Sequence, residues 1–469
     1  MKRDVVRLER LKICNVKNIL EGEIFFSEQK KLLRGELDEN LDFASVLGIY
    51  GQNGSGKTSV LNALRIIQIL FSRNTLGNRI SDYVNVDKDY FSLEADFLVS
   101  NDNGDFYVMY EIEIGKTKKD GTIINQLEIN KEKLSYFKFD ENKKKINAFS
   151  YERPERINTA FLEKLPQKER VIYQYTCSIE TSTSTNNGAL LSAIFNPKLS
   201  NIVLNNKELF GDYADIVFDL ANFAISGLAI YTINYFNENE NVGIRFRVKN
   251  DDDVNNVVGD MFVPFTPSSL PIKAFAIFKS IIKKVNRVMP NIIPGYSVSI
   301  IETNKREVQQ LTGFVEFVLM SKRSDGGKEI PLVYESNGIK KIISILSGLI
   351  DAYSHEGCLM AIDEIDSGIF EYLLGEIVYV FDSFGFGQLL FTSHNMRVLE
   401  KINYKNIFFT TTDKTNTFIQ LSQIRESNNL RDMYYKYIAN GYKNDMKLYD
   451  MVKTEELANS MYIDTLGDK

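Results

Sequence analysis

The 469-residue sequence predicts an α/β fold in which a mixed sheet is joined to an antiparallel β lobe and carries a helical insertion. Three observations support this. Short apolar runs at residues 46–50 and 359–362 lead into glycine or acidic residues and then into segments with helical periodicity. Apolar and polar residues alternate around turn signals between residues 91 and 114. The spacing of apolar residues becomes helical over residues 152–289.

The amino-acid composition limits the classes of protein to which the chain can belong. The chain is 44% hydrophobic and 25% charged, which is enough to bury a large core. Its formal charge of −6 argues against a surface that binds nucleic acid over its whole extent, although a local basic patch stays possible. The three cysteines are far apart and form no C-x-x-C pair, so we expect a cytoplasmic protein without a zinc site.

No membrane span is expected. The start of the sequence lacks the apolar segment of a secretory signal. The longest apolar stretch, residues 216–236, is interrupted by Asp219, Asn222 and Asn234, so we interpret it as a buried helix.

The chain divides into four expected regions. These are residues 1–150, an N-terminal lobe with β hairpins; 151–290, a helical insertion; 291–420, a C-terminal lobe; and 421–469, a helical tail. Within them, strands are predicted at residues 91–99, 106–114, 123–129, 296–302, 312–320 and 388–393, and two more within residues 5–26. Residues 271–289 are predicted to form an amphipathic helix.

Residues 51–58, GQNGSGKT, match the phosphate-binding loop pattern G-x-x-x-x-G-K-[ST]. Glycines allow backbone N–H groups to surround a polyphosphate, and the helix that follows adds its positive N-terminal dipole. The alternative is a chance match in a turn, but a buried strand precedes the motif and an apolar helix follows it. We therefore expect ATP to bind here and Mg²⁺ to be held by the Thr58 hydroxyl. The expected ATP-binding residues of this loop are Asn53, Gly54, Ser55, Gly56, Lys57, Thr58 and Ser59.

A second motif, YESNGIKK at residues 334–341, precedes a predicted apolar helix. Ser336 and Gly338 would lie at the helix N-terminus, where free N–H groups can hold an anion. The alternative is that Ser336 only caps the helix.

Two further strands end in chemically active residues. Asp363 and Glu364 directly follow the apolar run 359–362, a placement that suits Mg²⁺ binding by Asp363 and general-base action by Glu364. His394 follows the strand at residues 388–393, where open α/β sheets place ligand-binding residues. Taken singly, each feature is also common in structural roles.

Lysines gather around the predicted hairpins and could contact nucleic acid, together with nearby aromatic residues. They are Lys116, Lys118, Lys119, Lys131, Lys133, Lys138, Lys143, Lys144 and Lys145. Acidic residues are interleaved with them, so a solvated hairpin face is the favoured interpretation.

Together, GQNGSGKT, ESNGIKK, MAIDEID and FTSHN resemble the Walker A, signature, Walker B and H-loop motifs of ABC-type ATPases. More narrowly, they are similar to the RecF/SMC-like branch that includes the OLD family and the ATPase subunits of abortive-infection systems such as PARIS and AbiL. The 278 residues between Thr58 and Ser336 disfavour a transporter domain, and sustained heptads typical of an SMC arm are missing. The glutamine of a Q-loop stays unassigned, with Gln126 and Gln174 as candidates.

The resemblance implies a homodimer or higher oligomer, in which ATP lies between the Walker A loop of one protomer and Ser336 and Gly338 of the other. It implies hydrolysis with Glu364 as base and with His394 and Lys57 stabilising charge. It also implies a sensor or scaffold for a separate effector, such as a nuclease, in antiphage defence. The alternative is a DNA-repair or DNA-end clamp.

Overall fold

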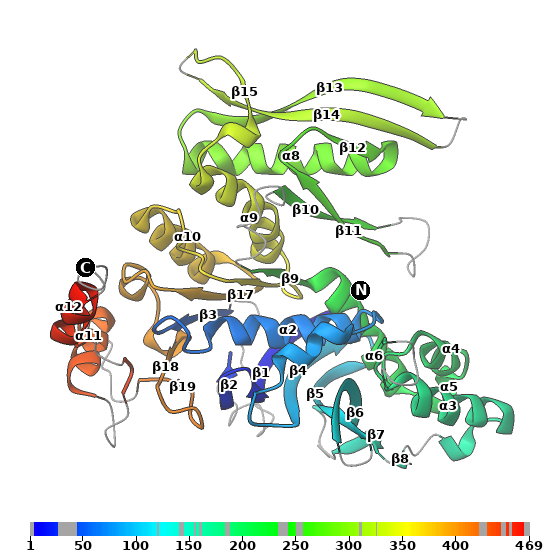
Figure 1. The fold of residues 1–469 in the computed structure, drawn as a ribbon. Helices are drawn as coiled ribbons and strands as arrows, with labels where there is room; N and C mark the ends of the chain where they lie inside the picture. The colour runs from blue at the N-terminus through cyan, green and yellow to red at the C-terminus, as the bar shows by residue number, and fades with distance from the viewer. Residues whose placement is uncertain are drawn as a thin grey trace.

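The computed structural model describes most of the chain (Figure 1). The described residues are 4–26, 45–119, 122–139, 145–153, 156–158, 162–182, 188–232, 243–249, 257–308, 312–324, 326–421, 429–441, 447–449 and 453–463.

A seven-stranded antiparallel sheet forms the N-terminal lobe, in the order β2-β1-β4-β5-β6-β7-β8. Its strands are β1 (Val5–Val16), β2 (Ile19–Phe25), β4 (Tyr90–Asn101), β5 (Gly104–Lys119), β6 (Thr122–Lys138), β7 (Ile146–Glu152) and β8 (Arg156–Asn158). The predicted hairpins are therefore present. Most of the connections in this sheet can be short, because most of its neighbouring strands are also neighbours in sequence.

The lysine-rich face of this sheet carries ion pairs. Lys131 and Lys133 approach Glu111 on the neighbouring strand at 3.0 and 3.5 Å. This pairing fits the solvated hairpin face. Lys143 and Lys144 lie outside the described residues.

A second sheet of six strands lies at the centre of the molecule, in the order β19-β18-β3-β17-β16-β9. Its strands are β3 (Ser45–Tyr50), β9 (Leu228–Tyr231), β16 (Leu359–Ile362), β17 (Gln388–Ser393), β18 (Ile407–Thr410) and β19 (Phe418–Ile419). The strands from β9 to β18 in this order run parallel, and β19 is antiparallel. The predicted fold class, α/β with a mixed sheet and an antiparallel β lobe, is confirmed.

Helix α2 (Lys57–Phe71) lies between the two sheets (Figure 1). Its apolar residues share one core with strands of both sheets, including Leu47 of β3 and Phe97 of β4. A helix covered on two sides needs apolar residues around most of its circumference, and α2 has them. On the opposite side of the central sheet lie α9 (Asn337–Ser354) and α10 (Glu371–Phe384).

The region 151–290 is not helical throughout, which corrects the expected helical insertion: strands separate its first, largely helical part from a long helix that begins at Ile272. The first part contains α3 (Gln167–Glu180), α4 (Pro197–Asn205), α5 (Lys207–Phe210) and α6 (Asp212–Asn222). The apolar stretch interpreted as one helix ends as a helix at Gly227, and β9 then joins the central sheet beside β16. The four apolar residues of β9 could not be told from a buried helix by periodicity alone.

An upper lobe follows, with β10 (Gly243–Lys249), β11 (Val257–Pro264), β12 (Ser268–Pro271), α8 (Ile272–Ile292), β13 (Tyr296–Val308), β14 (Thr312–Arg323) and β15 (Ile330–Pro331). The predicted helix and the two long strands are present. Phe275 and Phe278 of α8 pack against Phe317 of β14. The expected boundary at residue 290 therefore passes through one packed unit.

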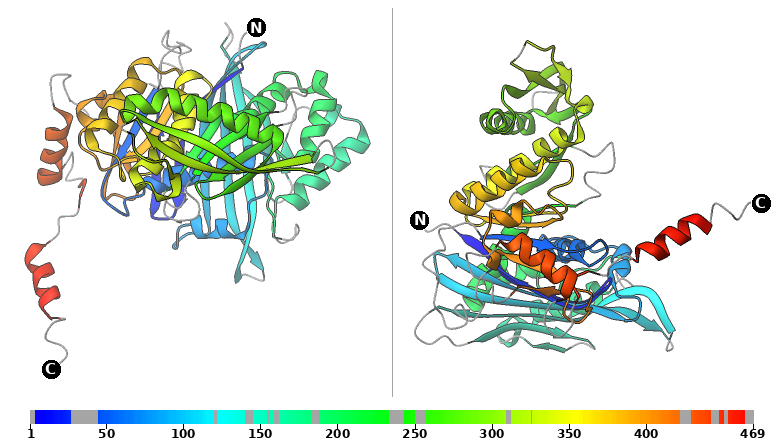
Figure 2. Two further views of the ribbon diagram at one scale, coloured as in Figure 1. Left: turned by 90° about the horizontal axis from the view of Figure 1, so that it is seen from above. Right: turned by 90° about the vertical axis from the view of Figure 1, so that its left-hand side faces the viewer.

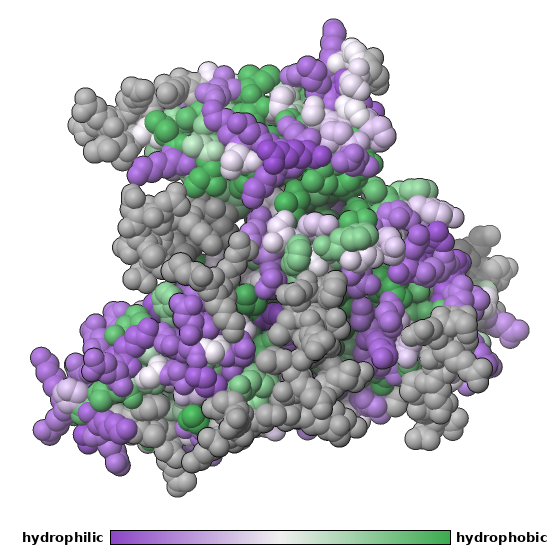
Figure 3. Space-filling model, turned by 180° about the vertical axis from the view of Figure 1, so that it is seen from behind, coloured by the Kyte–Doolittle hydropathy of each residue, from purple (hydrophilic) through white to green (hydrophobic). Residues whose placement is uncertain are grey.

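Two helices end the described chain, α11 (Leu430–Asn440) and α12 (Thr454–Ile463), and α12 stands away from the body in both views of Figure 2. Seen from behind, apolar side chains gather mainly where the upper lobe joins the body (Figure 3). Among the helices that the structure describes, none has the length and apolar character needed to cross a membrane.

Candidate functional site

Three neighbouring parallel strands bring the predicted residues to one edge of the central sheet. Tyr50 at the end of β3 pairs with Ser393 at the end of β17, and Phe391 of β17 pairs with Ile362 at the end of β16. The loops that leave these strands therefore start side by side. They carry the phosphate-binding loop, the pair Asp363 and Glu364, and His394. This edge is where open α/β sheets bind ligands.

The phosphate-binding loop is shaped by glycines and by its neighbours. Gly54 and Gly56 have φ angles of 75° and 101°, which favour glycine. A Cβ on Gly56 would lie 2.9 Å from Ile19 Cγ1, so the turn after β1 fits closely against the loop. The Ser55 hydroxyl donates to the carbonyl of Gln52 at 2.7 Å and accepts from the Thr410 hydroxyl at 2.8 Å. These contacts hold the loop in a fixed conformation.

Lys57 begins α2 and is 7% exposed. Its Nζ donates to the carbonyl oxygens of Gly51 and Gln52 at 2.8 and 2.9 Å. Burial lowers the pKa of Lys57, while Asp363 and Glu364 act to raise it. Lys57 therefore lies within electrostatic reach of the carboxylates at the end of β16.

The other predicted loop residues differ in their surroundings. Asn53 and Gly54 are exposed, and Thr58 is half-buried. Ser59 is only 3% exposed within α2.

Asp363 is the most buried acid of the site, at 1% exposure. Its Oδ1 accepts from the Thr392 hydroxyl at 2.6 Å, and its buried Oδ2 has no hydrogen-bond partner among the described residues. A buried carboxylate oxygen without a partner is costly, because it has lost water and gained nothing in exchange. Such an oxygen is well suited to bind a cation.

Glu364 has a left-handed backbone, with φ of 45°. Its main-chain N–H donates to Thr392 Oγ1 at 2.7 Å, and its carbonyl accepts from Lys341 Nζ. Non-glycine residues with positive φ are strained, and the surrounding hydrogen bonds must hold them in place. The structure thus fixes the backbone of the predicted base from both sides.

Asp366 is a site residue that the sequence interpretation missed. Its Oδ2 accepts from the main-chain N–H of His394 at 3.2 Å, and its buried Oδ1 has no hydrogen-bond partner in the part of the chain that the structure describes. Burial and Lys57 lower the pKa of His394, while Asp366 acts to raise it. The signal in the sequence is the third carboxylate of the run DEID, which by itself indicates only the start of a loop.

Ser336 and Gly338 lie at the start of α9. The exposed Ser336 side chain caps α9 by accepting from the main-chain N–H of Ile339 at 3.4 Å. A Cβ on Gly338 would lie 2.2 Å from the carbonyl oxygen of Gly368, so α9 begins in close contact with the loop after Glu364. Lys341, one turn further along α9, was also missed, although it is the second lysine of ESNGIKK.

The two glutamines considered for a Q-loop are on elements outside the central sheet. Gln126 lies in β6 of the antiparallel lobe, and Gln174 lies in α3. Within the central sheet, β16 is bordered by β17 and β9.

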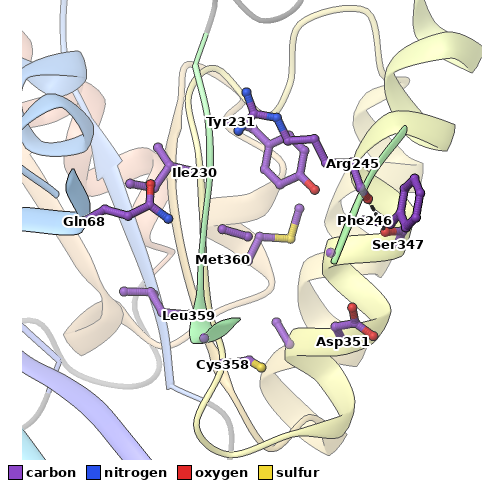
Figure 4. Close-up of a pocket in the computed structure, with 14 residues that line it drawn as sticks. Gln68, Ile230, Tyr231, Arg245, Phe246, Ser347, Asp351, Cys358, Leu359 and Met360 are labelled. Atoms are coloured by element: carbon purple, nitrogen blue, oxygen red, sulfur yellow. Dashed lines mark hydrogen bonds between the residues drawn. The ribbon is translucent and has the colours of Figure 1, made fainter. Parts of the chain in front are cut away.

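A cavity of about 40 Å³ lies apart from this site, between β9, β10 and α9 (Figure 4). Its lining includes Tyr231, Arg245, Ser347 and Met360, and the Ser347 hydroxyl donates to the carbonyl of Arg245 at 3.0 Å. None of the predicted site residues lines it.

The residues present fit a magnesium nucleotide. The partnerless Oδ2 of Asp363 offers a ligand for a cation, and the positive-φ glycines of the loop leave N–H groups uncovered by side chains. Lys57 adds a positive charge to the same loop.

No protein-family model and no curated protein matches the sequence. Several solved structures are similar in fold. An SMC head bound to the C-terminal winged-helix domain of ScpA is 13% identical, with 89% of this chain and 98% of that chain covered and a TM-score of 0.44. The SMC head domain from Thermotoga maritima is 12% identical, with coverages of 89% and 99% and a TM-score of 0.37. The recombination mediator protein RecF with ATP is 14% identical, with coverages of 83% and 94% and a TM-score of 0.33.

Proposed function

We propose that this protein is an ABC-type ATPase that binds Mg²⁺-ATP at the end of β3 and hydrolyses it. The observation that carries the proposal is the buried Asp363, whose free Oδ2 lies at the strand edge shared with Lys57, Glu364 and His394. The loops after three adjacent strands thus supply a positive charge, a general base and a metal ligand. Phosphoryl transfer to water requires these groups.

Each side chain has a distinct role in this proposal. Thr58 and Asp363 would hold Mg²⁺, which neutralises phosphate charge when bound. Lys57 would lend positive charge to the phosphates, and Glu364 would accept the proton of the attacking water. His394, held through its main chain by Asp366, would stabilise charge on the transferred group.

A second copy of the chain would complete the site. The start of α9 presents exposed Ser336 and Asn337, and it packs on the loop after Glu364. Exposed aromatic residues flank it, since Tyr334 is 77% and Phe370 is 69% exposed. A helix N-terminus can bind an anion, and one that is bordered by exposed apolar surface supports an ATP-dependent contact between two protomers.

In the cell, we propose that this ATP-dependent oligomer acts as sensor or scaffold for a separate effector, such as a nuclease, in antiphage defence. The support is the resemblance of the four motifs to the ATPases of abortive-infection systems. The second candidate is a DNA-repair or DNA-end clamp, supported by the RecF/SMC-like motif set. ATP turnover that rises with duplex DNA and falls steeply with salt would favour the clamp.

The ATPase proposal is tested with two variants, measuring phosphate release and molecular mass with and without ATP. Glu364→Gln removes the base, so we expect kcat to fall about 100-fold or more and an ATP-bound dimer to accumulate. Lys57→Ala removes the ammonium group that would bind the ATP phosphates, so no ATP-bound dimer should form.

The control is Glu371→Gln, which neutralises an exposed carboxylate at the start of α10. It should leave turnover unchanged. Wild-type turnover in both site variants would refute the assignment.

A further inference from the structure

Lys341 is a buried lysine that joins helix α9 to the candidate base. It is 5% exposed, and its Nζ donates to the main-chain carbonyl of Glu364. Burial lowers the pKa of Lys341 to about 8, while Asp366, Glu364 and Asp363 act to raise it. A lysine is rarely buried, because its ammonium loses water, so its position here needs a reason.

The group that it contacts is strained. Glu364 adopts φ of 45°, and its backbone is held by Thr392 on the N–H side and by Lys341 and the N–H of Ser367 on the carbonyl side. Thr392 belongs to β17, whereas Lys341 belongs to α9. The backbone of Glu364 is therefore held in part by a hydrogen bond from α9.

The start of α9 is itself packed on the loop that contains Glu364. Gly338 approaches the carbonyl of Gly368 so closely that a Cβ would lie 2.2 Å from it. The exposed Ser336, which caps α9, and the buried Lys341 are five residues apart, so both lie at the start of the same helix, around its first turn. A displacement of this turn would change the position of the Glu364 carbonyl.

We infer that Lys341 is a positioning residue that couples the start of α9 to the orientation of Glu364. The inference rests on the proposed ATPase function. When a second copy contacts Ser336, α9 settles in one position, and Lys341 transmits that position to the base. Hydrolysis is then fast only in the assembled oligomer.

The test is Lys341→Met, which keeps an unbranched side chain only one atom shorter and removes the donor. We expect kcat to fall about tenfold or more, while KM for ATP stays within about twofold, because the residue does not touch the nucleotide. The variant also leaves the nearby carboxylates of Asp366, Glu364 and Asp363 without the charge of Lys341, so its melting temperature is expected to fall and kcat is measured well below it. The ATP-bound dimer should still form.

Lys340→Met is the matched control. Lys340 is the preceding residue of α9, is half-buried, and donates to the carbonyl of Val333 at 3.4 Å. Its substitution should leave kcat unchanged. If Lys341→Met does not fold, Lys341→Gln, which is shorter but polar, should show the same loss of kcat.

The possible results separate the inference from the proposed function. No ATP hydrolysis by the wild-type protein would contradict the function itself. Wild-type turnover together with an unchanged kcat in the folded Lys341 variant would overturn only the coupling. A raised KM with unchanged kcat would likewise overturn it, because it would place Lys341 in nucleotide binding.

Discussion

The hydroxyl of Thr392 joins the two acids of the candidate site. It donates to Asp363 Oδ1 at 2.6 Å and accepts from the main-chain N–H of Glu364 at 2.7 Å. A hydroxyl can donate and accept at once, which a valine of the same shape cannot. Thr392 therefore fixes the orientation of the Asp363 carboxylate. The same hydroxyl also fixes the position of the Glu364 main-chain N–H.

Thr392→Val should weaken metal-dependent catalysis. Partners that orient a metal ligand typically contribute about 10- to 100-fold to affinity or activity, and we expect kcat/KM to fall in that range. The Mg²⁺ concentration needed for half-maximal turnover should rise. Thr392→Ser keeps the hydroxyl and should retain most of the activity. A Val variant with the Mg²⁺ dependence of the wild type would argue against Asp363 as metal ligand.

Gly338→Ala should disrupt the start of α9. The added Cβ would lie 2.2 Å from the carbonyl oxygen of Gly368, a distance at which the backbone must shift. We expect ATP turnover to fall about tenfold or more, because the contact between α9 and the loop after Glu364 is lost. Turnover and melting temperature are the measurements.

Gly77→Ala is the control for this change. A Cβ on Gly77 meets no heavy atom within 4 Å, and its φ of −83° suits alanine. It should behave as wild type. Equal turnover in Gly338→Ala and Gly77→Ala would show that the close approach has no bearing on activity.

Asp219 should make stability depend on pH. Burial raises the pKa of Asp219 to about 7. The charges of Asp4 and Asp215 also raise this pKa, whereas the Asn101 amide and Lys207 lower it. The folded state therefore keeps a proton that the unfolded chain releases near about pH 4. The contribution of Asp219 to stability is full below that pH and is lost as pH rises through about 7.

Asp219→Asn tests this directly, because the amide still accepts from Asn101 but does not ionise. The free energies of unfolding of wild type and variant are measured with urea between about pH 4 and pH 8. They should be similar at about pH 4, and the variant should be more stable than wild type at about pH 8. Each tenfold difference in proton affinity between the folded and unfolded chain corresponds to about 1.4 kcal/mol. Parallel curves over the whole range would mean that Asp219 titrates normally.

Much of the fold and part of the site could be predicted because the signals are local. The phosphate-binding loop, the hairpins and helix α8 each carry their pattern within about twenty residues. Strand β9 could not be found in this way, because its four apolar residues directly follow a helical pattern that runs through α6 to Gly227. Its pairing with β16 joins Leu228 to Leu359, a separation that a single sequence does not reveal.

Lys341 and Asp366 were missed for a similar reason. Each acts through a main-chain group of another element: Lys341 through the carbonyl of Glu364, and Asp366 through the N–H of His394. Main-chain partners leave no signature in residue identity, so a motif can indicate Glu364 and His394 but not the side chains that hold them.

The position of β3 in the central sheet has a consequence for biosynthesis. Its two neighbours are β17 and β18, which begin at Gln388 and Ile407. On the ribosome, the antiparallel lobe can pair its strands as they emerge, whereas β3 must wait for more than three hundred further residues before it gains a partner. Until β17 and β18 have been synthesised, the nascent chain therefore holds an apolar strand without its sheet neighbours, and the loops that follow β3, β16 and β17 do not yet lie side by side.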